Sequence, residues 1–155
     1  MKTNSILFLL FIYCISAFGQ KQEHLDLLET DPTWRKEVFR FPISFAKEIP
    51  LEGIADVRFP KGWADQKSRE FWSYAFGWNV SLPNKLTQAK LEEYMRIYFD
   101  GLMRVVHKED TEIPKTIASF MALPDPNKNI CYQGSITVFD AFFTKKTMEL
   151  NVLVD

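Results

Sequence analysis

Residues 72–82 alternate strictly between large apolar side chains and small or polar ones. The large side chains occupy the even positions: Trp72, Tyr74, Phe76, Trp78, Val80 and Leu82. Successive side chains of a β-strand point to opposite faces, so this period of two predicts a strand with one aromatic face. We expect that face to pack under a helix, because aromatic rings contribute strongly to a core. The alternative is an exposed platform for sugar rings or an apolar partner, built from Trp72, Tyr74 and Trp78.

A second periodic segment follows and predicts a long amphipathic helix from Thr87 to His107. Its apolar side chains recur at spacings of four and three residues, at Leu91, Met95, Tyr98, Leu102 and Val105. This spacing places them on one helical face. Thr87 is of a residue type that caps helix N-termini. Gly101 weakens a helix interior, so we expect close packing at that position.

Charged residues occupy the other face of this helix. Glu92 and Arg96, and likewise Asp100 and Arg104, are four residues apart with the acidic residue first. Opposite charges at this spacing are neighbours on a helix surface. The sequence therefore predicts two solvent-exposed ion pairs along the helix.

Apolar alternation and turn residues predict further strands before and after the helix. We expect them at residues 37–43, 56–59, 116–123, 131–143 and 148–154, with turns at 60–63, 124–129 and 144–147. Short connections between the last three strands favour antiparallel pairing. The expected fold is therefore α+β: a mainly antiparallel sheet of five to six strands with one long amphipathic helix packed on one face.

One domain over residues 20–155 accounts for this pattern. Its last strand alternates up to Val154 and ends without a polar tail. An unpaired apolar edge strand invites pairing with another chain. Two interpretations are open: the domain is complete, or residues beyond Asp155 or a partner complete the sheet.

The first residues have the three parts of a secretory signal peptide. Lys2 is basic, residues 6–14 are apolar, and Ala17 and Gly19 are the small residues before a cleavage site. The sequence predicts a signal peptide at residues 1–19 and a secreted or periplasmic protein. A retained anchor and lipid attachment at Cys14 are the alternatives. We expect no stable membrane span after cleavage, because the apolar stretch is shorter than the roughly 20 residues that cross a bilayer.

Composition excludes several classes of function. The formal net charge of −1 offers no basic surface for nucleic acid. After cleavage Cys131 is the single cysteine, so no disulfide can form within one molecule. His24 and His107 are far apart and have no second ligand in register, so we expect no metal site. The glycine-rich motifs that bind nucleotides are absent, so we expect no cofactor.

Three residues are weak candidates for catalysis: Asp140, His107 and Cys131. Asp140 continues an apolar row after Ile136 and Val138. A carboxylate on that side needs a partner, and we expect the strand end to turn it toward water instead. We expect His107 to act as a cation at the helix C-terminus, and Cys131 to be a buried, inert thiol.

Residues 57–63 join a short strand to Pro60 and a Gly62–Trp63 pair. This stretch of seven residues resembles the strand, proline, glycine–tryptophan opening of PsbP and Mog1-like exported domains. No motif indicates an enzyme family. The sequence thus predicts an exported, non-enzymatic module that binds a protein, a small molecule or a glycan. The alternative is a small extracytoplasmic hydrolase with a dispersed acid/base or thiol site.

Overall fold

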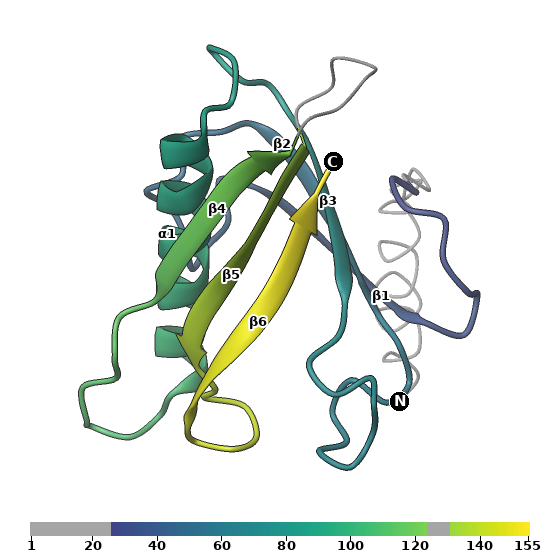
Figure 1. Ribbon diagram of the computed structural model, residues 1–155, viewed down its shortest axis with the longest axis vertical. Helices are drawn as coiled ribbons and strands as arrows, with labels where there is room; N and C mark the ends of the chain where they lie inside the picture. The colour runs from purple at the N-terminus through teal and green to yellow at the C-terminus, as the bar shows by residue number, and fades with distance from the viewer. Residues whose placement is uncertain (1–25, 124–130) are drawn as a thin grey trace, which may run out of the picture.

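Two three-stranded antiparallel sheets and one helix make up an α+β fold (Figure 1). The computed structural model describes residues 26–123 and 131–155. The first sheet has the order β1–β2–β3, formed by Arg35–Phe41, Gly53–Phe59 and Ala75–Val80. The second sheet has the order β4–β5–β6, formed by Ile117–Leu123, Cys131–Phe139 and Thr147–Val154. The helix α1, Gln88–Val106, lies between the two sheets in the chain. The predicted signal peptide and the predicted turn at 124–129 lie outside the described residues.

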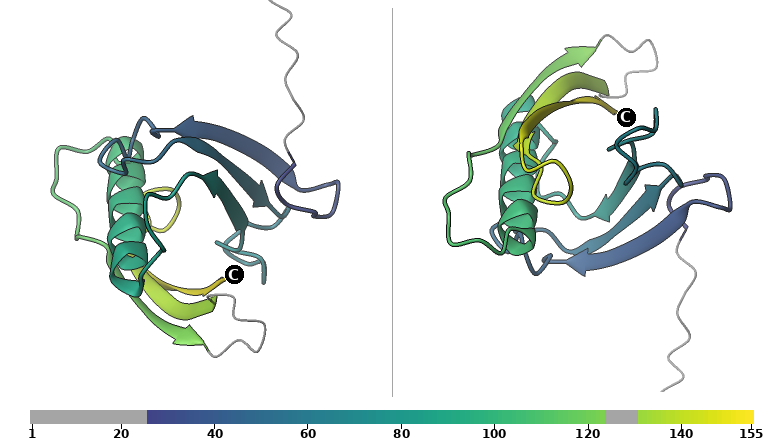
Figure 2. Two further views of the ribbon diagram at one scale, coloured as in Figure 1. Left: turned by 90° about the horizontal axis from the view of Figure 1, so that it is seen from above. Right: turned by 90° about the horizontal axis from the view of Figure 1, so that it is seen from below.

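The α+β class and the antiparallel pairing are confirmed, but the expectation of one continuous sheet is wrong. Each strand pairs with its neighbour in the chain: β1 with β2, β2 with β3, β4 with β5 and β5 with β6. After β3 the chain enters α1 and starts a second sheet, so β3 and β6 both remain edge strands. Figure 2 shows the two sheets around a common interior, with α1 along one side.

Two predicted strands are shorter than expected. The aromatic alternation forms a strand only at Ala75–Val80, because Trp72 lies in a turn with a φ of 58°. The strand expected at 131–143 ends at Phe139, because the carboxylate of Asp140 binds the backbone that follows it. A backbone that satisfies a side-chain acceptor in this way leaves the strand ladder.

The predicted helix and its N-cap are confirmed. Thr87 Oγ1 accepts the Lys90 N–H at 3.3 Å, and the His107 N–H donates to the Met103 carbonyl at 2.8 Å. Gly101 marks a close approach, as expected: a Cβ there would lie 1.8 Å from the Phe45 carbonyl oxygen. The apolar face of α1 packs on β4 and β5, but Val105, which was expected on this face, is 65% exposed.

Glu92 was expected to pair with Arg96, and Asp100 with Arg104, along α1. The main contacts of both carboxylates are instead with backbone N–H groups at β4. Glu92 Oε1 accepts the Phe120 N–H of β4 at 2.9 Å. Asp100 Oδ1 accepts the Thr116 N–H, just before β4, at 2.8 Å. The Asp100 carboxylate also lies 3.8 Å from Arg96. A backbone N–H at a sheet edge competes well for a carboxylate, because charge-assisted hydrogen bonds are stronger than exposed ion pairs.

One hydrophobic core joins the helix and both sheets. The aromatic face of β3 reaches α1 through Tyr98, whose ring lies 6.3 Å from Phe76 and 5.9 Å from Trp78. The expectation that this face packs against the helix is therefore confirmed at Tyr98. The same face also meets the interior side of the second sheet, which the prediction of one sheet did not include.

The opposite face of the first sheet is covered by residues 26–30. The Leu27 N–H donates to Asp56 Oδ2 at 3.0 Å, and Leu28 lies over Gly77. Asp56 is fully buried there and pairs with Arg58 Nε at 2.6 Å. This buried ion pair was not predicted, because charged residues in a short strand are usually assigned to its wet face.

Candidate functional site

Asp140 lies buried at the end of β5, where it organises the loop to β6. It is 0% exposed, which contradicts the expectation that it turns toward water. Its carboxylate accepts the backbone N–H groups of Phe142, Phe143 and Thr144 at 3.0, 3.1 and 2.7 Å. A buried carboxylate with three such donors has its hydrogen-bonding capacity largely filled. The residue is an anchor of the loop.

The protonation of Asp140 follows from these contacts. Burial by itself raises the pKa of a carboxyl, but the amide groups of Thr144 and Phe143 outweigh it and lower the pKa of Asp140. The side chain is therefore ionised at neutral pH. A general acid at neutral pH needs a raised pKa, so this residue is unsuited to that role.

The structure separates Cys131 from the other two catalytic candidates, His107 and Asp140. Cys131 begins β5 and Asp140 follows its last residue, so nine residue steps at about 3.3 Å place them roughly 30 Å apart. Cys131 is half-buried, and its Sγ lies 3.6 Å from Asp155 Oδ1. The His107 ring lies at the other end of β5, 5.6 Å from the Phe139 ring. Cys131 therefore shares no site with either of the other two.

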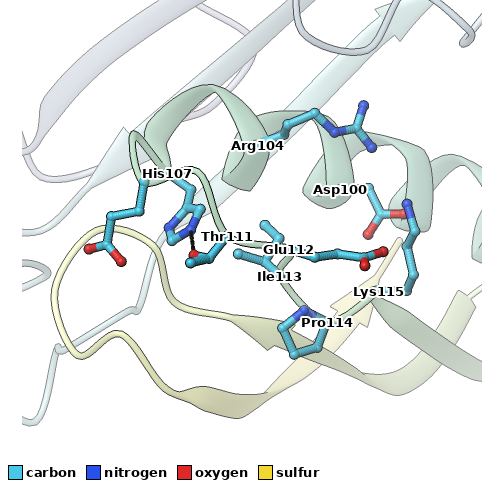
Figure 3. A pocket seen from close by; sticks show the side chains of 9 residues that line it. Asp100, Arg104, His107, Thr111, Glu112, Ile113, Pro114 and Lys115 are labelled. Carbon is cyan, nitrogen blue, oxygen red and sulfur yellow. Dashed lines mark hydrogen bonds between the residues drawn. The ribbon is translucent and has the colours of Figure 1, made fainter.

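His107 borders a cavity of about 230 Å³ at the C-terminal end of α1 (Figure 3). Its Nε2 lies 2.8 Å from Thr111 Oγ1. Asp100, already bound to the β4 backbone, lines the other end of the cavity with Lys115. The lining carries both signs of charge. Within residues 26–123 and 131–155, no group of three or more His, Cys, Asp or Glu side chains is placed to hold a metal ion.

The proposed aromatic platform is largely part of the core. Trp72 is only 6% exposed and packs against Phe142 and Phe143 from the β5–β6 loop. Tyr74 and Trp78 are half-buried, and each contacts the neighbouring Phe76 ring. A ring enclosed as Trp72 is cannot stack on a sugar without a rearrangement. Burial raises the pKa of the Tyr74 hydroxyl, which therefore stays protonated and offers no base.

The four sheet edges differ in how they are protected against pairing with another chain. The edge of β4 lies beside α1, whose Glu92 and Asp100 accept backbone N–H groups there. The edge strand β1 is charged at four of its seven residues, a common device against edge-to-edge association. Both devices disfavour an added strand.

Within the described residues, the other two edges, of β3 and β6, have neither protection. We call them the open edges. No charged residue occurs in β3, and Glu149 is the single charged residue of β6. In Figure 1 β3 and the C-terminal end of β6 both lie on the side of the molecule away from α1.

The side chains behind the open edges are apolar and incompletely covered. On β6 every second residue is half-buried against the core, and we call this set the inner row: Met148, Leu150, Val152 and Val154. On β3 the corresponding residues are Phe76, Trp78 and Val80. The Trp78 indole N–H is buried and has no hydrogen-bond partner in the part of the chain that the structure describes. Sequence alternation identified both rows but not their proximity, which depends on strand order.

Comparison with known proteins gives no match to a protein-family model, a curated protein or a solved structure. The resemblance at residues 57–63 is thus not extended to a family. None of the described segments forms a helix that is both long and apolar enough to cross a membrane.

Proposed function

We propose that this chain is an exported, non-enzymatic binding module, and that it binds a protein partner at the open edges of β3 and β6. The observation that carries this proposal is the contrast between the four sheet edges. Two are covered or charged, whereas the edges of β3 and β6 are neither in the part of the chain that the structure describes. Natural proteins protect long edge strands unless pairing is part of their function.

The half-buried inner row of β6 supports the same proposal. Four apolar side chains there are each partly accessible to solvent. Their exposure is intermediate between that of core residues and that of fully exposed surface residues. A partner that covered them would remove apolar area from water, the main favourable term in protein association.

Trp78 adds a polar feature to this apolar surface. Buried indole N–H groups nearly always have an acceptor, and a missing one costs free energy. The Trp78 N–H has none among the described residues. Because this N–H is itself buried, a bound polypeptide would supply a carbonyl acceptor only after the side chains around Trp78 move aside.

The alternative of a hydrolase finds less support in the geometry. Cys131 is remote from His107, and Asp140 is engaged by backbone amides. The candidate base His107 does not lie beside the candidate nucleophile Cys131, whose Sγ is 3.6 Å from Asp155 Oδ1 instead.

A library of displayed twelve-residue peptides, selected on the exported chain, tests the proposed function. Val152→Thr keeps the shape of an inner-row side chain but adds a hydroxyl to the surface that the partner would cover. We expect it to weaken the selected peptides about tenfold, as a polar group buried without a partner costs about 1–3 kcal/mol. Fluorescence anisotropy measures the affinities, and thermal unfolding without peptide checks each variant's fold.

Ile117→Thr is the matched control, because it makes the same kind of change on the outer face of β4 at a side chain that is 65% exposed. Its affinities should stay within about twofold of the original chain. The proposed function would be contradicted if the selected peptides bound both variants as tightly as the original chain, or if the selection yielded no binder.

A further inference from the structure

We infer that the partner binds as an extended strand added to the edge of β6, with apolar side chains on alternate residues and basic side chains between them. This inference rests on the proposed function and specifies its partner. Extended peptides bind sheet edges through main-chain hydrogen bonds, while side-chain pockets on alternate residues give specificity.

The regularity of β6 makes its edge suitable for such pairing. Its eight residues pair with β5 without interruption, from Thr147 opposite Phe139 to Val154 opposite Tyr132. The strand contains no proline, and its pairing has no bulge. Its outward-facing backbone groups therefore form an evenly spaced row, which an extended chain can meet residue by residue.

β6 is a better template than β3 for two reasons. β3 has six residues, and Gly77 lies in its middle, where the chain offers no side chain for cross-strand packing. The outer face of β3 is also approached by Leu28 at Gly77. Both faces of an added strand would be more constrained there than at β6.

The inner row determines which side chains the added strand presents to the interior. Because cross-strand neighbours share a face, every second residue of the partner would lie beside Met148, Leu150 or Val152. Phe76 and Trp78 of the other sheet pack against the same hydrophobic core as this row. Branched apolar residues fit a pleated, half-buried surface of this kind.

The outer face of the second sheet determines which side chains are favoured at the partner residues that lie between the inward-facing ones. On that face Glu149 is the charged residue of β6, and Asp155 follows the strand. The described strands β4 and β5 carry no charged residue. Opposite charges on adjacent strands attract and like charges repel, so lysine or arginine is favoured opposite Glu149 and glutamate is disfavoured.

The probe is a synthetic nine-residue peptide, Lys-Val-Thr-Val-Lys-Val-Thr-Val-Lys, with two N-methylated analogues. One analogue carries methyl groups on the amides of three of the four valines, and the other on the amides of the three residues that lie between the four valines. Consecutive amides of a strand point to opposite edges, so one analogue blocks the hydrogen bonds to β6. We expect at least one analogue to bind tenfold or more weakly, and the amides of β6 to exchange more slowly when the parent peptide is bound.

A charge exchange gives a second readout. Glu149→Lys should weaken the lysine peptide several-fold and strengthen a peptide with glutamates at the same places. Glu109→Lys, at an exposed residue beyond α1, should change neither affinity by more than about twofold.

Three results would overturn the inference: analogues that both bind like the parent, slowed exchange only outside β6, or no binding of any peptide in the series. If the analogues bind like the parent while Val152→Thr still weakens library-selected peptides, the binding function stands and strand addition is wrong. If the library selection itself yields no binder, the binding function is wrong as well.

Discussion

Asp140 illustrates how a carboxylate in an apolar row can serve the fold rather than a reaction. Three backbone N–H groups converge on it, and the loop they belong to carries Phe142 and Phe143 into the core. Asp140→Asn places an amide NH₂ where one of these donors points. We expect a loss of about 1–3 kcal/mol in the free energy of unfolding, because a hydrogen bond in a buried site is replaced by repulsion. Urea unfolding at pH 7 measures it.

The pH dependence of this loss distinguishes the charge from the shape of the side chain. The pKa of folded Asp140 lies below its ordinary value of 3.8. A lowered folded pKa contributes stability that is present above the unfolded pKa and is lost as the pH falls through the folded one. The difference between the original chain and Asp140→Asn should therefore shrink below about pH 4. Asp110→Asn, in an exposed loop, is the control and should show no such difference.

Gly101 is constrained by the backbone that passes beside it. A Cβ at this position would lie 1.8 Å from the Phe45 carbonyl oxygen, so α1 or the 42–52 segment would have to move. Gly101→Ala gains about 1 kcal/mol of helix propensity. Overpacking against backbone costs about 1–3 kcal/mol or more, so we expect a net loss of stability. Thermal unfolding measures this loss. The control Val105→Ala, on the exposed side of α1, should change the stability very little. A Gly101→Ala variant that is more stable than the original chain would contradict the close packing.

The helix α1 protects the edge of β4 through its carboxylates. Glu92→Ala removes the acceptor of the Phe120 N–H, and we expect a loss of about 1–2 kcal/mol. Amide exchange at Phe120 should accelerate more than at other β4 residues. Glu93→Ala is the matched control, because Glu93 pairs with Lys90 where its side chain is 44% exposed, and it should contribute at most about 0.5 kcal/mol. Equal effects of the two variants would show that the contact to β4 is unimportant.

Strands and helix could be predicted individually because their hydrophobic periods are local. The helix ends were right to within one residue, since Thr87 and His107 are its caps. Strand order was not predictable in the same way, because residue alternation specifies which face is apolar but not which strand lies next to it. One sheet was therefore expected where two share a core.

The residues of the candidate site divide in the same way, into local features that the sequence predicts and tertiary features that it does not. The aromatic alternation correctly predicted the face that packs toward the core at Phe76 and Trp78, which are half-buried. Trp72 belongs to a turn, which a regular pattern of side chains conceals. The roles of Asp140 and Glu92 depend on backbone amides brought near them by tertiary structure. The open edges follow from strand order and from the protection of the other edges, neither of which the sequence states directly.

At the scale of the whole molecule, the two sheets are joined at one end by aromatic side chains, which we call the aromatic clamp: Trp63, Trp72, Phe142 and Phe143. Two come from the segment between β2 and β3, and two from the loop between β5 and β6. The Trp63 ring meets the Phe143 ring edge-to-face, with centroids 5.1 Å apart. The clamp lies at the end of the molecule where the Asp140 carboxylate holds the loop between β5 and β6. Its residues come from the segments that lead into β3 and β6, which are also the two strands with open edges.

If the clamp holds the sheets together, Trp63 and Phe143 should be energetically coupled. We expect Trp63→Leu and Phe143→Leu each to lower the free energy of unfolding, and the double variant to lose about 0.5–1.5 kcal/mol less than the sum, since edge-to-face ring pairs contribute about that much. Trp63→Leu combined with Ile117→Ala, on the exposed face of β4, should be additive within about 0.5 kcal/mol. Urea unfolding followed by both tryptophan fluorescence and far-ultraviolet circular dichroism should give coincident transitions in the original chain. Zero coupling, or separate transitions for the two probes, would mean that the sheets are stabilised independently and that the clamp does not fix the spacing of the open edges.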